Sequence, residues 1–222
     1  MCGRYALAGL DDHLPWPSAL AQRAGQPAAK TEGEVFPGDL VPVLANSRSM
    51  KPTLFAMRWG YTLPGGRRVI NARSETAASS PLFADGMRQR RCLVPAVRYD
   101  EWERRGREKI RYAVRPSGCA RFFMAAVYRM EQDGPVFAIL TRSSAERIAF
   151  IHDRMPVILP DALAADWLSP ASDPEQLLHA AVSEVEFGAM LPARTVNRHD
   201  AGCITDEVIE VPPLCDRGRS FA

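Results

Sequence analysis

The chain has 222 residues, of which 46% are hydrophobic and 24% charged, with a formal net charge of +2. This length and composition allow a folded core, and no apolar run is long enough to span a bilayer. The nearly balanced charge excludes a generally basic nucleic-acid binder, so DNA contacts would have to come from local arginine clusters. We therefore expect one domain over residues 1–222.

The hydrophobic pattern predicts a chain rich in β-strands. An Ala/Pro-rich stretch at 15–29 predicts a short helix and a loop. Alternating and β-branched residues then predict strands at 34–44, 53–59, 91–99, 110–115, 122–128, 136–141 and 155–159. Helical patterns occur at 81–90, 144–151, 161–168 and 174–182, the second with a capping box from Ser143 and Glu146. Because helices and strands do not alternate, we predict an α+β fold with a mostly antiparallel, barrel-like β core and peripheral helices.

The five cysteines form no CxxC pair and no disulfide framework, which is typical of a reducing compartment. The N-terminus lacks the apolar stretch of a secretory signal. We therefore expect a soluble, cytoplasmic protein. Cysteine and histidine residues lack the spacing of metal ligands, so we expect neither a metal site nor a cofactor. Cys92 and Cys119 lie in apolar segments and are expected to be buried and inert.

Cys2 is the most informative residue, because removal of Met1 would leave one residue with both a free α-amine and a thiol. Such an aminothiol condenses with an aldehyde to a Schiff base, and the thiol then closes onto the imine carbon to form a thiazolidine. The reference pKa of an α-amine is about 7.7–8.0, so part of it is the neutral nucleophile near pH 7. The alternative is a small buried side chain without a chemical role.

Three further segments deliver polar side chains from apolar strands or helices. Asn71 and Arg73 share one face of a short strand, with a surface ion pair from Arg73 to Glu75 as the alternative. Glu101 follows an apolar strand, and the alternative is a solvated side chain among its charged neighbours. His152 is expected at a helix C-terminus, which would favour its protonated form; the alternative is that it only binds the last helix carbonyls.

Together, these segments resemble the SOS response-associated peptidase family, also described as abasic-site processing proteins. The matching strings lie in family order at residues 1–5, 59–61, 70–76, 91–96, 99–102, 124–126 and 151–159, with a weaker match at 196–197. Several unrelated motifs in one order argue against a chance match.

The resemblance implies a covalent reaction with abasic sites in single-stranded DNA, whose ring-opened sugar carries an aldehyde at C1′. It implies that Cys2 supplies the amine and the thiol and that Asn71 positions it. It also implies that Glu101 transfers protons, and that His152 assists ring opening and reversal of the crosslink.

The resemblance further implies how the DNA is held. Arg4, Arg73 and Arg154 match phosphate-binding positions, and Pro37 matches a residue that presses on a neighbouring base. Single strands are preferred because C1′ of a stacked duplex nucleotide is poorly accessible. The expected partner is therefore single-stranded DNA that contains abasic sites, bound by a monomer away from any membrane.

Two segments depart from the family pattern. Residues 33–37 replace a Tyr-Asn-x-Ala-Pro string, so an Asn contact is lost and Glu34 is unfavourable near phosphates unless it turns away. Residues 62–68 lack a tryptophan-rich loop, and Arg67 and Arg68 are candidates to substitute for it electrostatically. These departures concern affinity and junction preference rather than the reacting residues.

Two other classes of function remain open. Cys2 and His152 could form the nucleophile and base of a cysteine-type peptidase or autopeptidase. A non-covalent reader of damaged or modified DNA would need the arginines but neither Cys2 nor Glu101.

Overall fold

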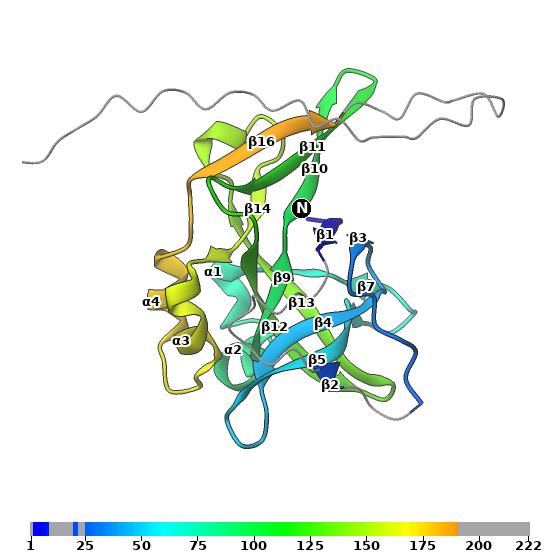
Figure 1. The fold of residues 1–222 in the computed structure, drawn as a ribbon, viewed down its shortest axis with the longest axis vertical. Helices are drawn as coiled ribbons and strands as arrows, with labels where there is room; N and C mark the ends of the chain where they lie inside the picture. Colours follow the sequence, from blue (N-terminus) through cyan, green and yellow to red (C-terminus); the bar gives the residue numbers. More distant parts are fainter. Residues whose placement is uncertain (1, 9–19, 22–24, 191–222) are drawn as a thin grey trace, which may run out of the picture.

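The structure is a computed structural model that describes residues 2–8, 20–21 and 25–190 (Figure 1). Most of the short helix expected at 15–29 and the weak family match at 196–197 lie outside the described residues. In the first of these regions the structure describes only the strand β2 (Leu20–Ala21) and residues 25–29.

Five strands close into a barrel-like ring at the centre of the fold (Figure 1). They are β4 (Leu40–Asn46), β5 (Pro52–Trp59), β9 (Arg91–Ala96), β12 (Phe122–Glu131) and β13 (Gly134–Ser143). Antiparallel pairing runs in the order β13-β12-β9-β4-β5, and a parallel pairing of Phe137 with Trp59 joins β13 back to β5. This closure confirms the α+β fold with a mostly antiparallel, barrel-like core.

Alternating side chains explain why the barrel strands are buried on both faces. On β9, Cys92 and Val94 belong to one apolar cluster, whereas Leu93 between them belongs to another. The second cluster includes Met87 and Trp167, which come from the helices that cover the barrel. Those helices are α1 (Ser74–Ala77), α2 (Ala84–Gln89), α3 (Ala164–Leu168) and α4 (Pro174–His179).

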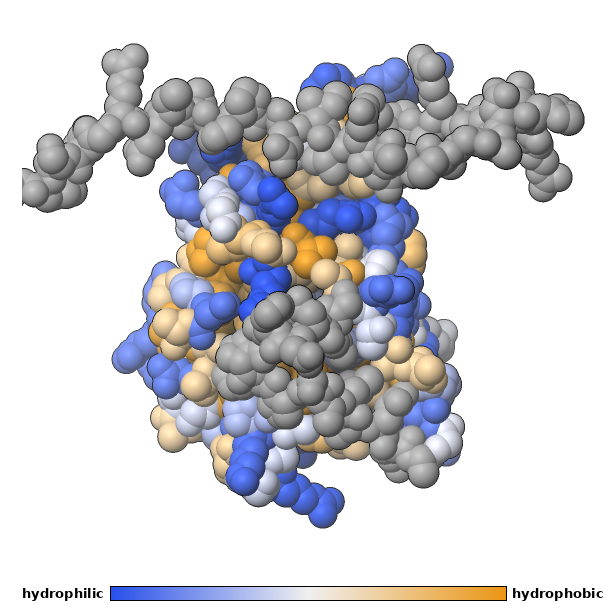
Figure 2. Space-filling view, viewed as in Figure 1, coloured by the Kyte–Doolittle hydropathy of each residue, from blue (hydrophilic) through white to orange (hydrophobic). Residues whose placement is uncertain are grey.

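A second, antiparallel sheet stands beside the barrel, in the order β16-β11-β10-β1-β3. Its strands are β1 (Tyr5–Leu7), β3 (Gly33–Val35), β10 (Arg98–Arg105), β11 (Glu108–Pro116) and β16 (Val185–Met190). The β10–β11 hairpin projects from the body, and apolar side chains are visible at the junction below it (Figure 2). The first residues of the chain reach this junction through β1.

Short elements complete the fold. They are the strands β6 (Tyr61–Thr62), β7 (Arg68–Val69), β8 (Asn71–Arg73), β14 (Arg154–Pro156) and β15 (Ile158–Leu159), and the 3-10 turns η1 (Glu146–Ile148) and η2 (Asp161–Leu163). No helix of the described part is long and apolar enough to cross a membrane.

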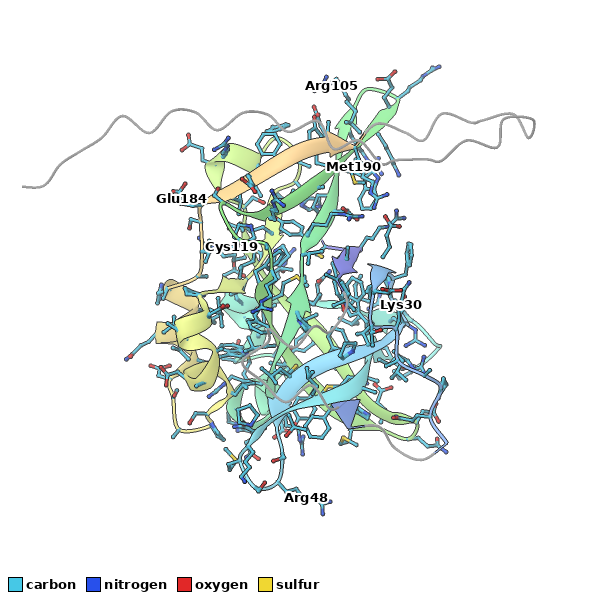
Figure 3. The ribbon with its side chains drawn as sticks, in the orientation of Figure 1. Lys30, Arg48, Arg105, Cys119, Glu184 and Met190 are labelled. Carbon is cyan, nitrogen blue, oxygen red and sulfur yellow. The ribbon has the colours of Figure 1, made fainter. Side chains whose placement is uncertain are left out.

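Several expectations about local structure were wrong. The strand expected at 91–99 is divided into β9 and β10, which belong to different sheets, and the one expected at 155–159 is divided into β14 and β15. The strand expected at 34–44 is divided into β3 and β4, because the chain turns through Pro37 and Gly38, whose φ is +97°. The helix expected at 144–151 is only η1, since Ala145 rather than Ser143 occupies its N-cap and no side chain caps it. Cys92 is buried as expected, but Cys119 is exposed after β11 (Figure 3).

Candidate functional site

Cys2 is fixed at the junction between the barrel and the second sheet, just before β1. Its side chain is fully buried, and its thiol donates a hydrogen bond to the Arg4 carbonyl at 3.6 Å. The Asn71 side-chain amide donates to the Cys2 carbonyl at 2.9 Å. These contacts fix both the side chain and the carbonyl group of Cys2.

Asn71 is itself held by the barrel. It begins β8, which pairs with β13 so that Asn71 lies opposite Ile139. The preceding carbonyl, that of Ile70, accepts from the Trp59 indole at 3.0 Å and from the Ile139 amide at 3.0 Å. The expected positioning role of Asn71 thus has a rigid support, 69 residues along the chain from Cys2.

Glu101 reaches the same junction from β10. Its strand pairs with β1, where Tyr99 lies opposite Tyr5, and the Asp100 amide donates to the Arg4 carbonyl at 2.9 Å. The Glu101 side chain is only 4% exposed. Burial raises its pKa to about 6, and the charges of Asp100 and Asp153 also raise it, while the α-amino group at the chain start lowers it in part. Glu101 therefore exchanges a proton close to neutral pH.

The Cys2 thiol lies within electrostatic reach of Glu101. Burial raises the pKa of the thiol well above its ordinary value, and the negative charge of Glu101 raises it further. The thiol therefore stays protonated at neutral pH, and it needs a base before it can attack an electrophile.

His152 lies between η1 and β14, the strand that pairs with β13 of the barrel. Its Nδ1 accepts a hydrogen bond from the Arg154 amide at 3.0 Å, which assigns the proton of the neutral ring to Nε2. Nδ1 also lies 2.7 Å from the Asp153 carboxylate, a contact that becomes an ion pair only when the ring is protonated. In the neutral ring, Nδ1 cannot both accept a hydrogen bond from the Arg154 amide and donate one to Asp153. We therefore assign Nδ1 as the acceptor of the Arg154 amide.

The expectation that a helix end favours protonated His152 was wrong. The helix stops at Ile148 as a single 3-10 turn, so there is no long row of aligned peptide dipoles. Burial instead lowers the pKa of His152, and the charges of the chain's α-amino group and of Arg154 lower it further, against the opposing charge of Asp153. Neutral His152 is suited to accept a proton at pH 7.

The expected DNA-binding residues differ in their surroundings. Arg73 is exposed at the end of β8 and makes no ion pair within the described part of the chain. Arg154 holds Glu75 through two hydrogen bonds of 2.7 and 2.8 Å, so Glu75 pairs with Arg154 and not with Arg73. Pro37 is exposed in the turn after β3, and the Arg4 guanidinium lies 3.5 Å from Glu34.

Sequence reasoning missed two tyrosines beside Cys2. Tyr5 and Tyr99 are fully buried, and their hydroxyl groups lack a hydrogen-bond partner within the described residues. Burial raises the pKa of both hydroxyl groups, and the charge of a Cys2 thiolate would raise it further. The alternation of β10, which places Tyr99 and Glu101 on one face, was the signal that could have pointed to them.

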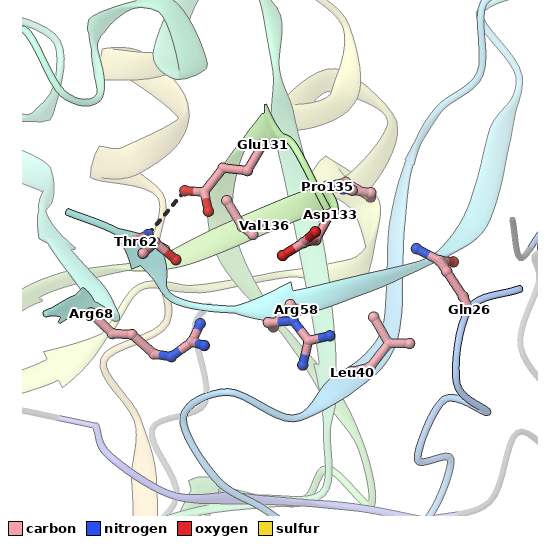
Figure 4. Close-up of a pocket in the computed structure, with 10 residues that line it drawn as sticks. Gln26, Leu40, Arg58, Thr62, Arg68, Glu131, Asp133, Pro135 and Val136 are labelled. Carbon is pink, nitrogen blue, oxygen red and sulfur yellow. Dashed lines mark hydrogen bonds between the residues drawn. The ribbon is translucent and has the colours of Figure 1, made fainter. Parts of the chain in front are cut away.

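A polar pocket elsewhere in the fold contains none of the expected site residues (Figure 4). It lies between β4, β5 and the β12–β13 turn, where Glu131 accepts a hydrogen bond from the Thr62 amide at 2.9 Å. Within the described residues, no group of three or more His, Cys, Asp or Glu side chains is placed to hold a metal ion.

The fold and the junction define a class: an α+β barrel protein with a buried cysteine near the start of the chain, within electrostatic reach of a buried carboxylate. Residues 1–199 match the family described as SOS response associated peptidase (SRAP), and the chain belongs to this family.

Curated relatives agree with that assignment, and solved structures share the fold. Abasic site processing protein YoqW of Bacillus subtilis (strain 168) is 30% identical over 190 residues, which cover 80% of this chain and 84% of the relative. Abasic site processing protein YedK of Escherichia coli (strain K12) is 27% identical over 209 residues, covering 90% and 91%. The crystal structure of a phage-related protein from Bordetella bronchiseptica shares 24% identity and a TM-score of 0.68 over 85% of this chain and 93% of that chain. A second crystal structure from the same organism has a TM-score of 0.67 at 20% identity, covering 86% and 100%.

Proposed function

We propose that this chain processes abasic sites in single-stranded DNA by forming a covalent thiazolidine through Cys2 once Met1 has been removed. The observation that carries the proposal is the environment of Cys2. Asn71 holds its carbonyl at 2.9 Å, and a buried Glu101 with a pKa of about 6 acts on its thiol electrostatically. Relatives at 25–30% identity are named abasic site processing proteins, which supports the substrate class.

The reaction balances with groups that the chain supplies. The neutral α-amine of Cys2 adds to the C1′ aldehyde, and the aldehyde oxygen leaves as water after it accepts protons, which gives a protonated imine. The thiol then adds to the imine carbon and its proton passes to a base. Glu101 suits both steps, because a carboxyl group with a pKa of about 6 can donate a proton to the leaving oxygen and accept one from the thiol.

His152 would act on the sugar before the covalent step. A closed abasic sugar opens when a base takes the proton of the C1′ hydroxyl and the ring oxygen is protonated. A neutral imidazole can accept that first proton, and the lowered pKa of His152 keeps it neutral at pH 7. Reversal of the crosslink would use the same groups in the opposite sense.

Arginines around the junction would hold the strand. Arg73 is exposed and is suited to bind a phosphate, whereas Arg154 must release Glu75 before it can bind one. Arg4 would contribute a third phosphate contact, and Pro37 is exposed where it could press on a base. We also predict that the protein acts as a monomeric single domain in the cytoplasm.

A cysteine peptidase fits the junction less well. Such enzymes attack with a thiolate whose pKa is lowered by a nearby positive charge. Here burial and the charge of Glu101 raise the pKa of the Cys2 thiol instead. The amine-first reaction avoids this difficulty, because the thiol adds only after a strongly electrophilic imine has formed.

The test is incubation of the purified protein with a single-stranded oligonucleotide that carries one abasic site. We expect a protein–DNA adduct that survives denaturing electrophoresis, and none with the same oligonucleotide carrying an intact base. Intact mass establishes first that Met1 is absent, since a retained Met1 blocks the amine. A processed protein that forms no adduct would overturn the proposal. Retention of DNA only under native conditions would favour a non-covalent reader, and cleavage of amide substrates without an adduct would favour a peptidase.

A further inference from the structure

The carboxylate of Glu34, on β3, is surrounded by arginine side chains. Oε2 lies 3.5 Å from the guanidinium of Arg4, while Oε1 lies 3.4 Å from that of Arg98 and also accepts from Arg111. Three guanidinium groups from three different strands or segments therefore converge on one carboxylate. Burial raises the pKa of Glu34, but the Arg111 hydrogen bond and the three positive charges outweigh it, so its pKa is lowered and the group is ionised.

Asp100 holds two of these arginines independently of Glu34. Its carboxylate accepts from Arg111 at 2.7 Å and from Arg98 at 3.3 Å, and its side chain is fully buried. The Glu34 side chain is 33% exposed and lies on the edge strand of the sheet. Arg98 and Arg111 would therefore keep Asp100 as a partner if Glu34 turned toward solvent.

Aromatic rings hold Arg4 in the same way. Its guanidinium lies 4.6 Å from the centre of the Phe36 ring and 5.1 Å from that of Trp102. The Arg111 guanidinium also lies over Trp102, at 5.9 Å. If Glu34 leaves, the three donors stay close together and face an empty anion position.

We propose that Arg4, Arg98 and Arg111 form a binding site for a DNA backbone phosphate, and that Glu34 occupies this site in the unbound protein and competes with the strand. A phosphate offers what Glu34 offers, namely ionised oxygens that accept from several forked guanidinium groups at once. The site is close to the reacting residues, although Asp100 and Glu101 lie on opposite faces of β10: Arg4 is two residues from Cys2, and Asp100 is within electrostatic reach of the Cys2 thiol. The inference rests on the proposed function only in taking DNA as the ligand, and it needs no covalent step.

The competition has a measurable consequence. The substitution Glu34→Gln removes the competing charge and leaves the arginines on Asp100 and the aromatic rings. We expect this variant to bind an undamaged single-stranded oligonucleotide about five- to tenfold more tightly at low salt. We also expect the slope of log K against log salt to steepen by about 0.7, the increment for one more phosphate contact to a single strand.

Glu186→Gln is the matched control. Glu186 forms an ion pair with Arg115 on the same sheet, and the substitution changes the net charge by the same amount. Equal gains from the two variants would show a general charge effect and overturn the proposal, as would weaker binding by Glu34→Gln. The double variant Glu34→Gln with Arg98→Gln should return the affinity close to that of the unmodified protein.

Folding can be separated from binding. Circular dichroism checks that Glu34→Gln folds. If that variant does not fold, Glu34→Asp replaces it: the charge is kept, but the shorter side chain reaches the arginines less well. Glu34→Asp should therefore also raise the affinity for the oligonucleotide. The two proposals fail separately. An abasic-site adduct without tighter binding by the Glu34 variants would overturn the phosphate site alone, and tighter binding without an adduct would overturn the covalent reaction alone.

Discussion

Asp100 and Glu101 are neighbours on β10, yet their surroundings differ sharply. Asp100 is fully buried and is bound by two guanidinium groups, those of Arg98 and Arg111. Glu101 is 4% exposed on the opposite face, beside the Cys2 thiol, and its pKa is raised to about 6. One carboxylate is compensated by arginines, whereas burial brings the pKa of the other close to the pH at which we propose that it transfers protons.

The comparison shows that strand alternation places two different groups of side chains on the two faces of β10. Its one face carries Asp100 and the arginine–carboxylate network that includes Glu34. Its other face turns Tyr99 and Glu101 toward the apolar cluster that contains Cys2. A shift of one residue in the pairing of β10 with β1 would exchange the two faces and remove the proposed acid/base group from the junction.

The largest expected effect is on stability, from Asp100→Asn. This change removes the fully buried charge between two partly buried arginines and leaves them only the more exposed Glu34 as an ionised partner, so we expect the free energy of unfolding to fall by about 3 kcal/mol. Urea denaturation measures it. Glu103→Gln on the same strand is the control: Glu103 pairs with the exposed Arg105 and accepts from the Tyr112 hydroxyl, a bond that the Gln oxygen can also accept, so this variant should unfold nearly as the unmodified protein does. Equal losses from both variants would contradict the structural role of Asp100.

Glu101→Gln should have the opposite effect on stability and a severe effect on the reaction. Loss of a general acid/base should slow adduct formation about 10²-fold, and denaturing gels sampled over time measure the rate.

The stability effect of the same variant follows from the pKa of Glu101, which is raised from 4.5 to about 6 in the folded protein. Its ionisation therefore lowers the free energy of unfolding progressively as the pH rises from 4.5 to about 6, and the full loss is present above about pH 6. Removing the charge should raise the free energy of unfolding by up to about 2 kcal/mol at about pH 7, with no gain below the ordinary pKa of a glutamate. A variant that is less stable at pH 7 would refute this interpretation.

Asn71→Ala tests whether Asn71 positions Cys2, and we expect effects of intermediate size. The change removes the donor to the Cys2 carbonyl, so we expect a loss of about 1 kcal/mol in stability. The adduct should form roughly tenfold more slowly, because the amine is less well oriented. Adduct formation, quenched at successive times over a series of DNA concentrations, separates the rate of the reaction from the affinity for DNA. An unchanged rate at saturating DNA would show that Asn71 does not orient the reacting residue.

The smallest effect is expected from Glu75→Gln on the surface beside α1. Glu75 binds Arg154 and its side chain is 48% exposed, so the stability loss should be below about 1 kcal/mol. Arg154 then becomes available to a phosphate, and fluorescence anisotropy should show slightly tighter binding of single-stranded DNA. Weaker binding would indicate that Glu75 is needed to orient Arg154.

Much of this molecule could be predicted from local patterns. Alternation along 91–99 and 122–128 indicated the barrel strands β9 and β12, although β9 ends at Ala96, and the strings around Cys2, Asn71 and Glu101 indicated the candidate site through their family resemblance. Those patterns are local because each strand carries its own two-residue period.

Features that depend on distant pairing could not be predicted. Closure of the barrel joins Trp59 to Phe137, and Glu34 meets Arg111 across 77 positions. The surroundings of His152 also escaped prediction, since a capping-box pattern suggested a helix that the packed chain does not form. Burial, which lowers the pKa of His152, is a property of the whole fold.

The most direct test of the central claim compares the unmodified protein with Cys2→Ser on an abasic single-stranded oligonucleotide, with and without borohydride. Serine keeps the α-amine but removes the thiol that closes the ring. We predict a stable adduct from the unmodified protein without reductant, and from Cys2→Ser an adduct only when borohydride traps the imine. A Cys2→Ser adduct that is equally stable without reductant would contradict the account that the amine and thiol of Cys2 both bond to C1′.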